Sequence, residues 1–233
     1  VYAPAADWRV YGSMSHGLQY GGIAPMETTN ENTALPPGRS KQFEVGVKRN
    51  VNQQLALSGA LFEIRQGLEY TNALNTFVRA GEQKHRGIEL SAMGQATRDL
   101  SYNLSLMALD TDQRDTGDAA TEGKRVTNVP KFRSAAWVEY AVPQLAGLKL
   151  DALWQYSSDK AFDPANRVKV PGYHVVGFGA AYGMRVGGLD TVIRARVDNA
   201  FDKFYWRDVT QSLGGYLLPG APRTFRVSAQ IDF

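Results

Sequence analysis

The sequence lacks the residues from which several kinds of site are built. Its 233 residues include no cysteine, which excludes a disulfide framework and a thiolate metal site. The three histidines, His16, His85 and His174, form no H-x-x-x-H pair, so we predict no metal centre. The nucleophile-elbow, H-E-x-x-H and P-loop motifs are also missing. We therefore expect neither an enzyme with catalytic residues nor a bound cofactor.

Long hydrophobic runs and clusters of one charge are scarce as well. No run of 18 apolar residues occurs, and the best candidate, residues 170–184, is interrupted by Pro171 and four glycines. Transmembrane helices are therefore excluded. The net charge of +3 is a small excess of 26 basic over 23 acidic residues without a basic cluster, so we expect no nucleic-acid partner. The chain starts at Val1 without a signal peptide, which predicts a mature protein or a fragment.

What the sequence does contain is alternation of apolar and polar residues. In residues 222–233 one parity holds Phe225, Val227, Ala229, Ile231 and Phe233, whereas the other holds Arg226, Ser228, Gln230 and Asp232. This period of two is typical of a strand with a different solvent on each face. A soluble β-sandwich would produce the same alternation, so one strand alone does not distinguish it from a membrane barrel.

Repetition of the pattern favours the membrane barrel. We predict ten strands, at residues 7–19, 37–49, 54–66, 77–96, 100–112, 131–143, 147–159, 171–185, 189–199 and 222–233. Most are long enough to cross a bilayer when tilted. Their charges fall on one parity, for example Glu44 with Lys48 and Glu63 with Arg65, and we expect that parity to face the lumen. The cost of placing Arg or Lys in mid-bilayer, about 2–4 kcal/mol, explains such sorting.

The connections between these strands alternate in length. Short connections are predicted at residues 50–53, 97–99, 143–147 and 186–188, and long ones at 20–36, 67–76, 113–130, 160–170 and 200–221. Outer-membrane barrels have short periplasmic turns and longer extracellular loops. The sequence thus predicts an all-β, antiparallel, up-and-down transmembrane β-barrel portion of about ten strands, in which the long loops are extracellular.

Several motifs resemble those of one receptor family. The run VDNAFDKFY at 197–205, followed by PGAPRTF at 219–225 and a last strand ending in Phe233, resembles the C-terminal signature of TonB-dependent outer-membrane receptors. The run AGEQKHRGIEL at 80–90, and GKR at 123–125 followed by NVPK at 128–131, resemble segments of the ferric-siderophore branch. The run YGSMSHGL at 11–18 resembles an earlier strand of the same family.

The resemblance implies a location and a function. Residues 1–233 would be the C-terminal portion of a 22-stranded barrel in the bacterial outer membrane, with the earlier strands, the plug domain and the TonB-contact segment outside this chain. The full receptor would take up a ferric siderophore, energised through TonB. Its further partners would be outer-membrane lipid and the barrel assembly machinery, which we expect to recognise Phe233.

Alternatives remain at this point. A receptor for haem or cobalamin would have the same fold, and a porin or an outer-membrane barrel enzyme would be a different class of protein. The sequence does not identify the ligand, because selective contacts lie in variable loops and in a plug. The acidic run at 110–118 could ligate calcium, but it lacks the bidentate Glu of that motif, which favours a solvated loop.

Candidate ligand contacts are the aromatic and basic residues of the long loops and upper strand ends. A bulky, often anionic chelate requires rigid aromatic surfaces and a few Arg or Lys donors. The candidates are Tyr20, Arg39, Tyr70, Phe77, Arg79, Phe162, Arg167, Tyr205, Trp206, Arg207 and Tyr216. Of these, Tyr205, Trp206 and Arg207 form the densest group, although alternating side-chain directions allow only part of it to face the lumen.

Overall fold

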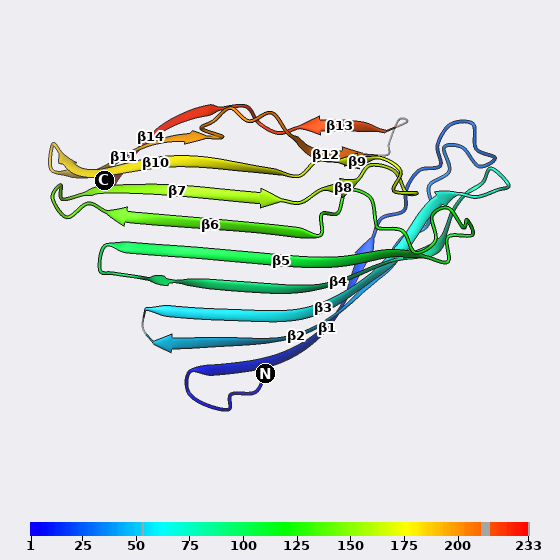
Figure 1. The fold of residues 1–233 in the computed structure, drawn as a ribbon, viewed down its shortest axis with the longest axis horizontal. Helices are drawn as coiled ribbons and strands as arrows, with labels where there is room; N and C mark the ends of the chain where they lie inside the picture. The colour runs from blue at the N-terminus through cyan, green and yellow to red at the C-terminus, as the bar shows by residue number, and fades with distance from the viewer. Residues whose placement is uncertain (53, 211–214, 233) are drawn as a thin grey trace.

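The computed structural model describes residues 1–52, 54–210 and 215–232. Within them no helix has the length and hydrophobicity that crossing a membrane would need. The main feature is one antiparallel sheet of ten strands, in the order β1-β2-β3-β4-β5-β6-β7-β10-β11-β14 (Figure 1). These strands are β1 (Trp8–Gln19), β2 (Gly38–Asn52), β3 (Leu55–Thr71), β4 (Phe77–Gln95), β5 (Leu100–Arg114), β6 (Phe132–Ala141), β7 (Leu148–Ser157), β10 (Tyr173–Val186), β11 (Leu189–Asp198) and β14 (Thr224–Asp232).

The ten predicted strands are confirmed, but two pairs of short strands were missed. β8 (Lys160–Ala161) pairs with β9 (Lys169–Val170), and β12 (Trp206–Thr210) pairs with β13 (Tyr216–Pro219). Both pairs lie inside predicted loops, where the segments are too short to show alternation. Phe233, the residue predicted to be read by the assembly machinery, lies outside the described residues.

The two ends of the sheet differ, as the connection lengths predict. Figure 1 shows short turns at one end and long loops at the other. A two-residue turn joins β10 to β11 through Gly187 and Gly188, whose φ values are 60° and 86°. Two successive residues with positive φ form the kind of turn that fits the twist of a hairpin, and glycine adopts it without strain. Long and short connections therefore segregate to opposite ends of the strands.

The pairing register assigns side chains to two faces. Partners in neighbouring antiparallel strands point to the same side, so a row of partners can be followed across the sheet. One face carries an apolar row made of Leu57, Ala92, Leu104, Ala136, Trp154 and Val176. The opposite face carries a mostly polar row made of Ser58, Ser91, Ser105, Ala135 and Gln155.

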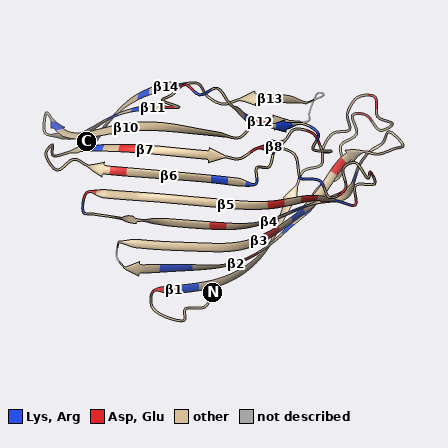
Figure 2. Ribbon diagram, in the orientation of Figure 1, with Lys and Arg blue, Asp and Glu red and all other residues tan. Residues whose placement is uncertain are grey.

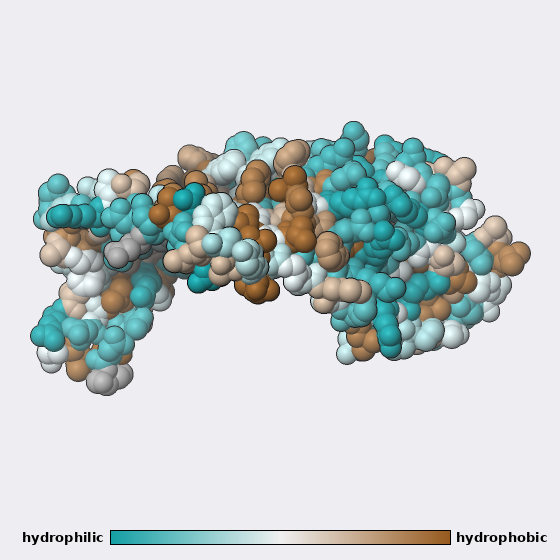
Figure 3. All heavy atoms as spheres, turned by 90° about the horizontal axis from the view of Figure 1, so that it is seen from below, coloured by the Kyte–Doolittle hydropathy of each residue, from teal (hydrophilic) through white to brown (hydrophobic). Residues whose placement is uncertain are grey.

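The apolar face forms a belt midway along the strands. Its side chains are exposed although they are large and hydrophobic; Leu61 keeps 54% and Leu90 49% of its surface accessible. In Figure 3 the hydrophobic side chains gather near the middle of the long axis, and hydrophilic side chains lie toward both ends. This arrangement suits a wall whose outer face contacts hydrocarbon and whose ends contact water.

One part of the predicted charge sorting is wrong. Phe43 pairs with Glu63 and Glu44 pairs with Phe62, so Glu63 lies on the outer face together with Phe43. The same holds for Arg65, two residues further along β3. Parity within one strand cannot reveal which face is which, because that depends on the register with the neighbouring strand.

The misassigned charges avoid hydrocarbon because β3 and β4 are longer than the belt. These strands contain 17 and 19 residues, and β3 extends to Thr71, beyond the predicted end at 66. From the midpoint of these strands toward the loops, Glu63 forms ion pairs with Arg65 at 2.7 Å, Lys84 at 2.9 Å and Arg86 at 3.0 Å. Figure 2 shows acidic and basic residues on these strands toward the loop end of the sheet. The outer face is therefore polar above the belt.

The topology leads to a labelling prediction. The exposed Ala119 lies in the long β5–β6 loop and the exposed Arg98 lies in the short β4–β5 turn. In a cysteine-free full-length receptor, Ala119→Cys should react with a membrane-impermeant maleimide on intact cells, whereas Arg98→Cys should react only after the outer membrane is permeabilised. Labelling of Arg98→Cys but not Ala119→Cys on intact cells would invert the orientation.

The assignment of faces leads to a second prediction. Leu106 lies on the apolar face beside Leu90, and its neighbour Ser105 lies on the polar face beside Ser91. Leu106→Arg should lower the free energy of unfolding in a bilayer by about 2–4 kcal/mol, because it places a charge in hydrocarbon. The matched change Ser105→Arg should cost much less. Equal losses in unfolding titrations of the full-length protein in lipid vesicles would contradict the assignment.

Candidate ligand-binding site

A pocket of about 670 Å³ opens on the polar face of the sheet near the loop end. Its floor is the row that contains Ser58, Ser91 and Ser105, in which the hydroxyls of Ser58 and Ser91 lie 2.7 Å apart in a hydrogen bond. The next row toward the loops contributes Glu89, Met107, Arg133, Ser157 and Tyr173. Register and cavity shape thus agree that this face is the concave, inner one.

Loop residues cover the pocket. Lys160 comes from β8, Asn128 from the β5–β6 loop, and Tyr205 and Arg207 from the segment that enters β12. The ring of Tyr205 packs against that of Tyr173, with centroids 4.2 Å apart and planes tilted by 34°. Two tyrosines therefore form a rigid aromatic surface where β10 meets the β11–β14 loop.

Gly220 allows Tyr205 to take this position. Its amide donates a hydrogen bond of 2.9 Å to the Tyr205 carbonyl, and a Cβ atom added at Gly220 would lie 1.9 Å from the Tyr205 ring. Only glycine fits there. Within the P-G-A-P sequence at 219–222, Gly220 therefore has a structural role: it leaves space for the Tyr205 ring that lines the pocket.

Basic groups dominate the rim nearest the loops. The Lys160 ammonium is buried and donates a hydrogen bond to the backbone carbonyl of Arg207. Burial lowers the pKa of Lys160, because it removes water from the charged form. Arg207 pairs with Asp208 at 2.8 Å, and this hydrogen bond lowers the pKa of the Asp208 carboxyl. The charges of Arg207 and Asp208 therefore largely compensate each other.

Arg133 differs from these groups. Its guanidinium has no hydrogen-bond or ion-pair partner among the described residues, and its side chain is exposed to the pocket. Glu89 lies in the same row, two strands away across Met107, and is likewise unpaired within the part of the chain that the structure describes. Neighbouring strands are about 4.8 Å apart, which separates the two backbones by roughly 10 Å. The pocket therefore has one cationic side and one acidic side.

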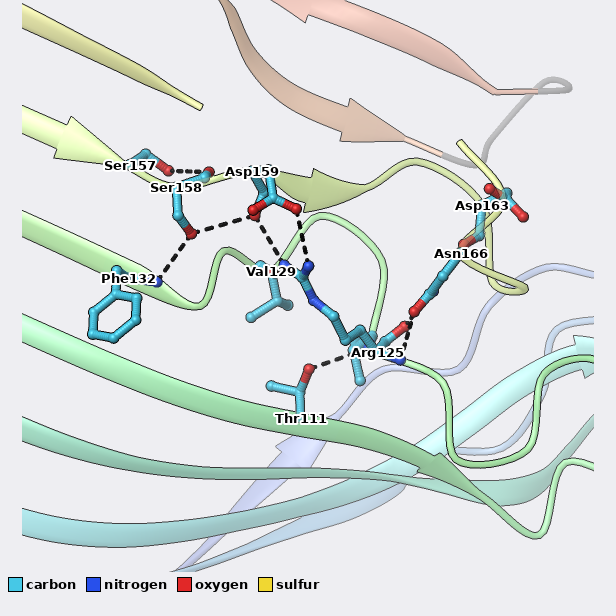
Figure 4. A network of polar contacts seen from close by, with 10 residues as sticks. Thr111, Arg125, Val129, Phe132, Ser157, Ser158, Asp159, Asp163 and Asn166 are labelled. Atoms are coloured by element: carbon cyan, nitrogen blue, oxygen red, sulfur yellow. Dashed lines mark hydrogen bonds and ion pairs between the residues drawn. The ribbon is translucent and has the colours of Figure 1, made fainter. Parts of the chain in front are cut away.

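Arg125 holds two of the covering loops together (Figure 4). Its guanidinium donates to the Asp159 carboxylate at 3.1 Å and to the Asp159 carbonyl at 2.9 Å, which links the β5–β6 loop to the β7–β10 loop. The Arg125 backbone completes the link through Asn166, whose amide bonds to both the N–H at 2.8 Å and the carbonyl at 3.0 Å. Asn166 has a φ of 58°, a conformation that asparagine tolerates well.

A third loop joins this unit through Asn128 and Lys160. The Asn128 side-chain oxygen accepts a hydrogen bond of 3.0 Å from the Val209 amide in β12, and the backbone amide of Asn128 donates to the Ala161 carbonyl at 3.0 Å. Together with the bond from Lys160 to Arg207, these contacts connect the β5–β6, β7–β10 and β11–β14 loops. We call the β5–β6, β7–β10 and β11–β14 loops, joined by these contacts, the loop block. It holds the roof of the pocket in place.

The structure distributes the sequence-predicted residues unevenly. Tyr205 and Arg207 line the pocket, so the densest predicted group does reach it. Trp206 points elsewhere and packs edge-on against Phe204, with centroids 4.9 Å apart. Tyr216 lies on β13 opposite Thr210. Ligand contact by any of them stays a prediction.

The two candidates of the β7–β10 loop lie away from the pocket lining. Phe162 bonds through its amide to the Val168 carbonyl at 2.9 Å, and its ring lies close to Gly215. The Arg167 side chain is exposed, and its amide donates to the Asp163 carboxylate at 3.2 Å. Both residues shape this loop.

The candidates from the first two loops lie apart from the pocket. Arg79 is bound to the Glu69 carboxylate and to the Pro36 carbonyl, the latter at 2.6 Å, so its donors are used to dock the β1–β2 loop on β3 and β4. Phe77 shares two backbone hydrogen bonds of 2.9 Å with the Asn30 side chain. These residues have structural contacts that sequence reasoning did not anticipate.

Of the remaining candidates, Tyr20 follows β1 and is 85% exposed. Arg39 pairs with Leu18 on the outer face of the sheet. The hydroxyl of Tyr70 approaches Gly117 in the β5–β6 loop. Contact between these residues and a ligand has not been tested.

The acidic run at 110–118 is divided between strand and loop. Asp112 lies in β5 and forms a bidentate contact with Arg114. Asp118 accepts the Ala120 amide at 2.9 Å. Within the described ranges no group of three or more His, Cys, Asp or Glu side chains is arranged to hold a metal ion.

Sequence reasoning missed several pocket residues. The missed residues that line the pocket are Tyr173, Gln155, Arg133, Lys160 and Asp208. A usable signal existed for Arg133 and Gln155, because both lie on the charged or polar parity of their strands. Lys160 and Asp208 carry no such signal, since their positions depend on how three loops pack.

The comparisons with known proteins give one family. Residues 1–200 match the family model described as TonB dependent receptor-like, beta-barrel. The ferrichrome receptor FcuA of Yersinia enterocolitica is 29% identical over 230 residues, covering 96% of this chain and 30% of that protein. The ferrichrome outer membrane transporter/phage receptor of Escherichia coli is 30% identical over 208 residues, covering 84% of this chain and 27% of that protein.

Solved structures agree with this result. The crystal structure of BauA, the ferric preacinetobactin receptor of Acinetobacter baumannii, matches with a TM-score of 0.81 and 29% identity, covering 99% of this chain and 35% of that one. This chain thus spans about a third or less of each of these three proteins. The family consists of receptors and transporters of the bacterial outer membrane, so neither a soluble sandwich nor a barrel enzyme remains as an alternative. The chain belongs to the TonB-dependent receptor family, and its ten-stranded sheet is part of that family's outer-membrane β-barrel.

Proposed function

We propose that this chain forms part of the wall and mouth of a receptor that takes up a ferric siderophore across the outer membrane. The observation that carries the proposal is the pocket on the inner face, at the end of the barrel where the long loops gather. It combines a tyrosine pair, Tyr173 with Tyr205, and the basic side chains of Arg133 and Lys160. Rigid aromatics with a few charged donors suit a bulky iron chelate.

The relatives support the class of ligand. Two of them are named ferrichrome receptors, and a solved relative is named a ferric preacinetobactin receptor. All three names refer to iron chelates and none to haem or cobalamin. In the proposed receptor the energy comes through TonB, which contacts a segment outside the 233 residues, and a plug domain completes the lumen.

The proposed mechanism assigns this chain two tasks. The inner wall and the loop block present a preformed surface to the chelate, so that little conformational entropy is lost on binding. The apolar belt keeps that surface in the membrane at a fixed depth. Movement of the chelate through the lumen is driven by the TonB complex acting on the plug.

Arg207 provides the direct test. Asp208 occupies only the Nε of Arg207, so the terminal N–H groups of Arg207 remain free among the described residues to contact a ligand. In the full-length receptor, Arg207→Ala should therefore weaken binding of the cognate ferric siderophore by about 1–2 kcal/mol, the scale of a lost charge-assisted contact. The matched control is Arg185→Ala, because Arg185 also pairs with an aspartate, Asp190, at 2.8 Å but lies in the short-turn half of β10. Equilibrium binding to both purified variants is the measurement. Equal affinities would remove Arg207 from the site.

The loop block gives a further prediction. Arg125→Ala removes the contacts to Asp159 and should increase hydrogen exchange in the β5–β6 and β7–β10 loops, since their tertiary hydrogen bonds are lost. Lys124→Ala, one residue earlier and exposed, should leave exchange unchanged. Exchange measured by mass spectrometry on the full-length receptor tests this. Unaltered protection in Arg125→Ala would show that the loops are held by other contacts.

A further inference from the structure

The charges in the pocket indicate which kind of iron chelate it would bind. Three basic side chains, Arg133, Lys160 and Arg207, and two acidic ones, Glu89 and Asp208, line it. Asp208 pairs with Arg207 at 2.8 Å and also attracts Lys160, so these three groups together keep one positive charge. The charges without a full partner among the described residues are therefore Arg133, Glu89 and, in part, Lys160. Their distribution is asymmetric, because the two basic groups lie toward β6 and β8 whereas Glu89 lies on β4.

The basic side has unused hydrogen-bonding capacity. Arg133 offers five N–H donors and makes no hydrogen bond within the described part of the chain. Lys160 has three ammonium protons, and the described residues supply one acceptor, the Arg207 carbonyl. Burying a lysine with an incomplete set of partners costs free energy, which a bound anion would recover.

The floor below these groups is neutral and polar. Ser91 and Ser105 present hydroxyls, and Gln155 presents an amide, one row further from the loops than Arg133. Such groups bind oxygen atoms through neutral hydrogen bonds. The strong, charge-assisted bonds are therefore available only on the side of Arg133 and Lys160.

We propose that the pocket selects ferric chelates with a net negative charge, such as ferric catecholates or ferric hydroxycarboxylates, over uncharged hydroxamate chelates. Arg133 and Lys160 bind the anionic oxygens, and Glu89 disfavours the opposite orientation. This inference rests on the proposed function, because it concerns the same site. The proposed preference differs from the ligand in the names of two relatives, which refer to ferrichrome.

The physical basis is the difference between the two kinds of ligand. An anionic oxygen at Arg133 gains a charge-assisted bond, which is about twice as strong as a neutral one. An uncharged chelate would occupy the pocket without compensating Lys160. Attraction between ligand and rim also acts before contact, so the association rate should fall with added salt for the anionic ligand alone.

The test uses the full-length receptor, a trianionic ferric catecholate and ferrichrome as an uncharged trihydroxamate. Arg133→Gln should weaken binding of the catecholate at least tenfold and change ferrichrome binding less than twofold. Arg133 has no hydrogen-bond or ion-pair partner in the described residues, so its replacement breaks no such contact within this part of the barrel. The matched control, Glu89→Gln, lies in the same row and has the opposite charge; it should leave catecholate affinity unchanged or raise it.

The outcomes separate the two proposals. If neither chelate binds to the wild-type receptor, the proposed function itself is wrong. If ferrichrome binds more tightly than the catecholate, or if Arg133→Gln leaves catecholate affinity unaltered, the receptor function stands and the anionic preference is overturned. A loss of affinity that is equal in Arg133→Gln and Glu89→Gln would also overturn it, since only a general disturbance of the pocket affects both alike.

Discussion

Pairing of backbone amides and carbonyls between neighbouring strands is the constraint on which the rest of this structure depends. Inside a bilayer no water is available for these groups, so each strand must satisfy them with its neighbours. The resulting pairing runs through the ten-stranded sheet, with register shifts in β2 at Asn50–Asn52 and in β3 at Leu68–Glu69. Once the register is fixed, every side chain is assigned to one face, and hydrocarbon can be contacted only by the face that carries Leu57, Leu104 and Trp154.

The same constraint creates the site. The register that puts apolar side chains on the outer face puts Ser91, Arg133 and Gln155 on the inner face. These three residues lie on three different strands and come together in the pocket. The pocket floor is thus a consequence of sheet geometry. Its roof has a different origin, because Lys160 and Tyr205 come from loops that are joined by Arg125 and Asn128. A rigid floor and a cross-linked roof suit a binding surface that is formed before the ligand arrives.

The outer face shows how strand length and charge are related. β3 and β4 continue past the apolar belt, and there the outer face carries Glu63 in contact with Arg65, Lys84 and Arg86. Charges are tolerated on this face because the surroundings are no longer hydrocarbon. Ion pairing lowers the remaining cost, and it joins β3 to β4 where the sheet leaves the membrane. The position of charged residues along one strand therefore depends on their depth in the membrane as well as on the face of the sheet.

The sequence by itself determined the ten strands of the main sheet, the alternation of short and long connections and the family. Each of these follows from local signals: a period of two, turn residues such as Gly187 and Gly188, and contiguous motifs. It also predicted Tyr205 and Arg207 as candidate ligand contacts, and both line the pocket. Register, faces and loop packing were decided only by the tertiary structure. Parity within β3 could not reveal that Glu63 lies beside Phe43, and nothing near Lys160 in the chain indicates that its ammonium contacts Arg207. The physical reason is that periodicity is a property of one strand, whereas a face and a pocket are properties of neighbours that are distant in the sequence.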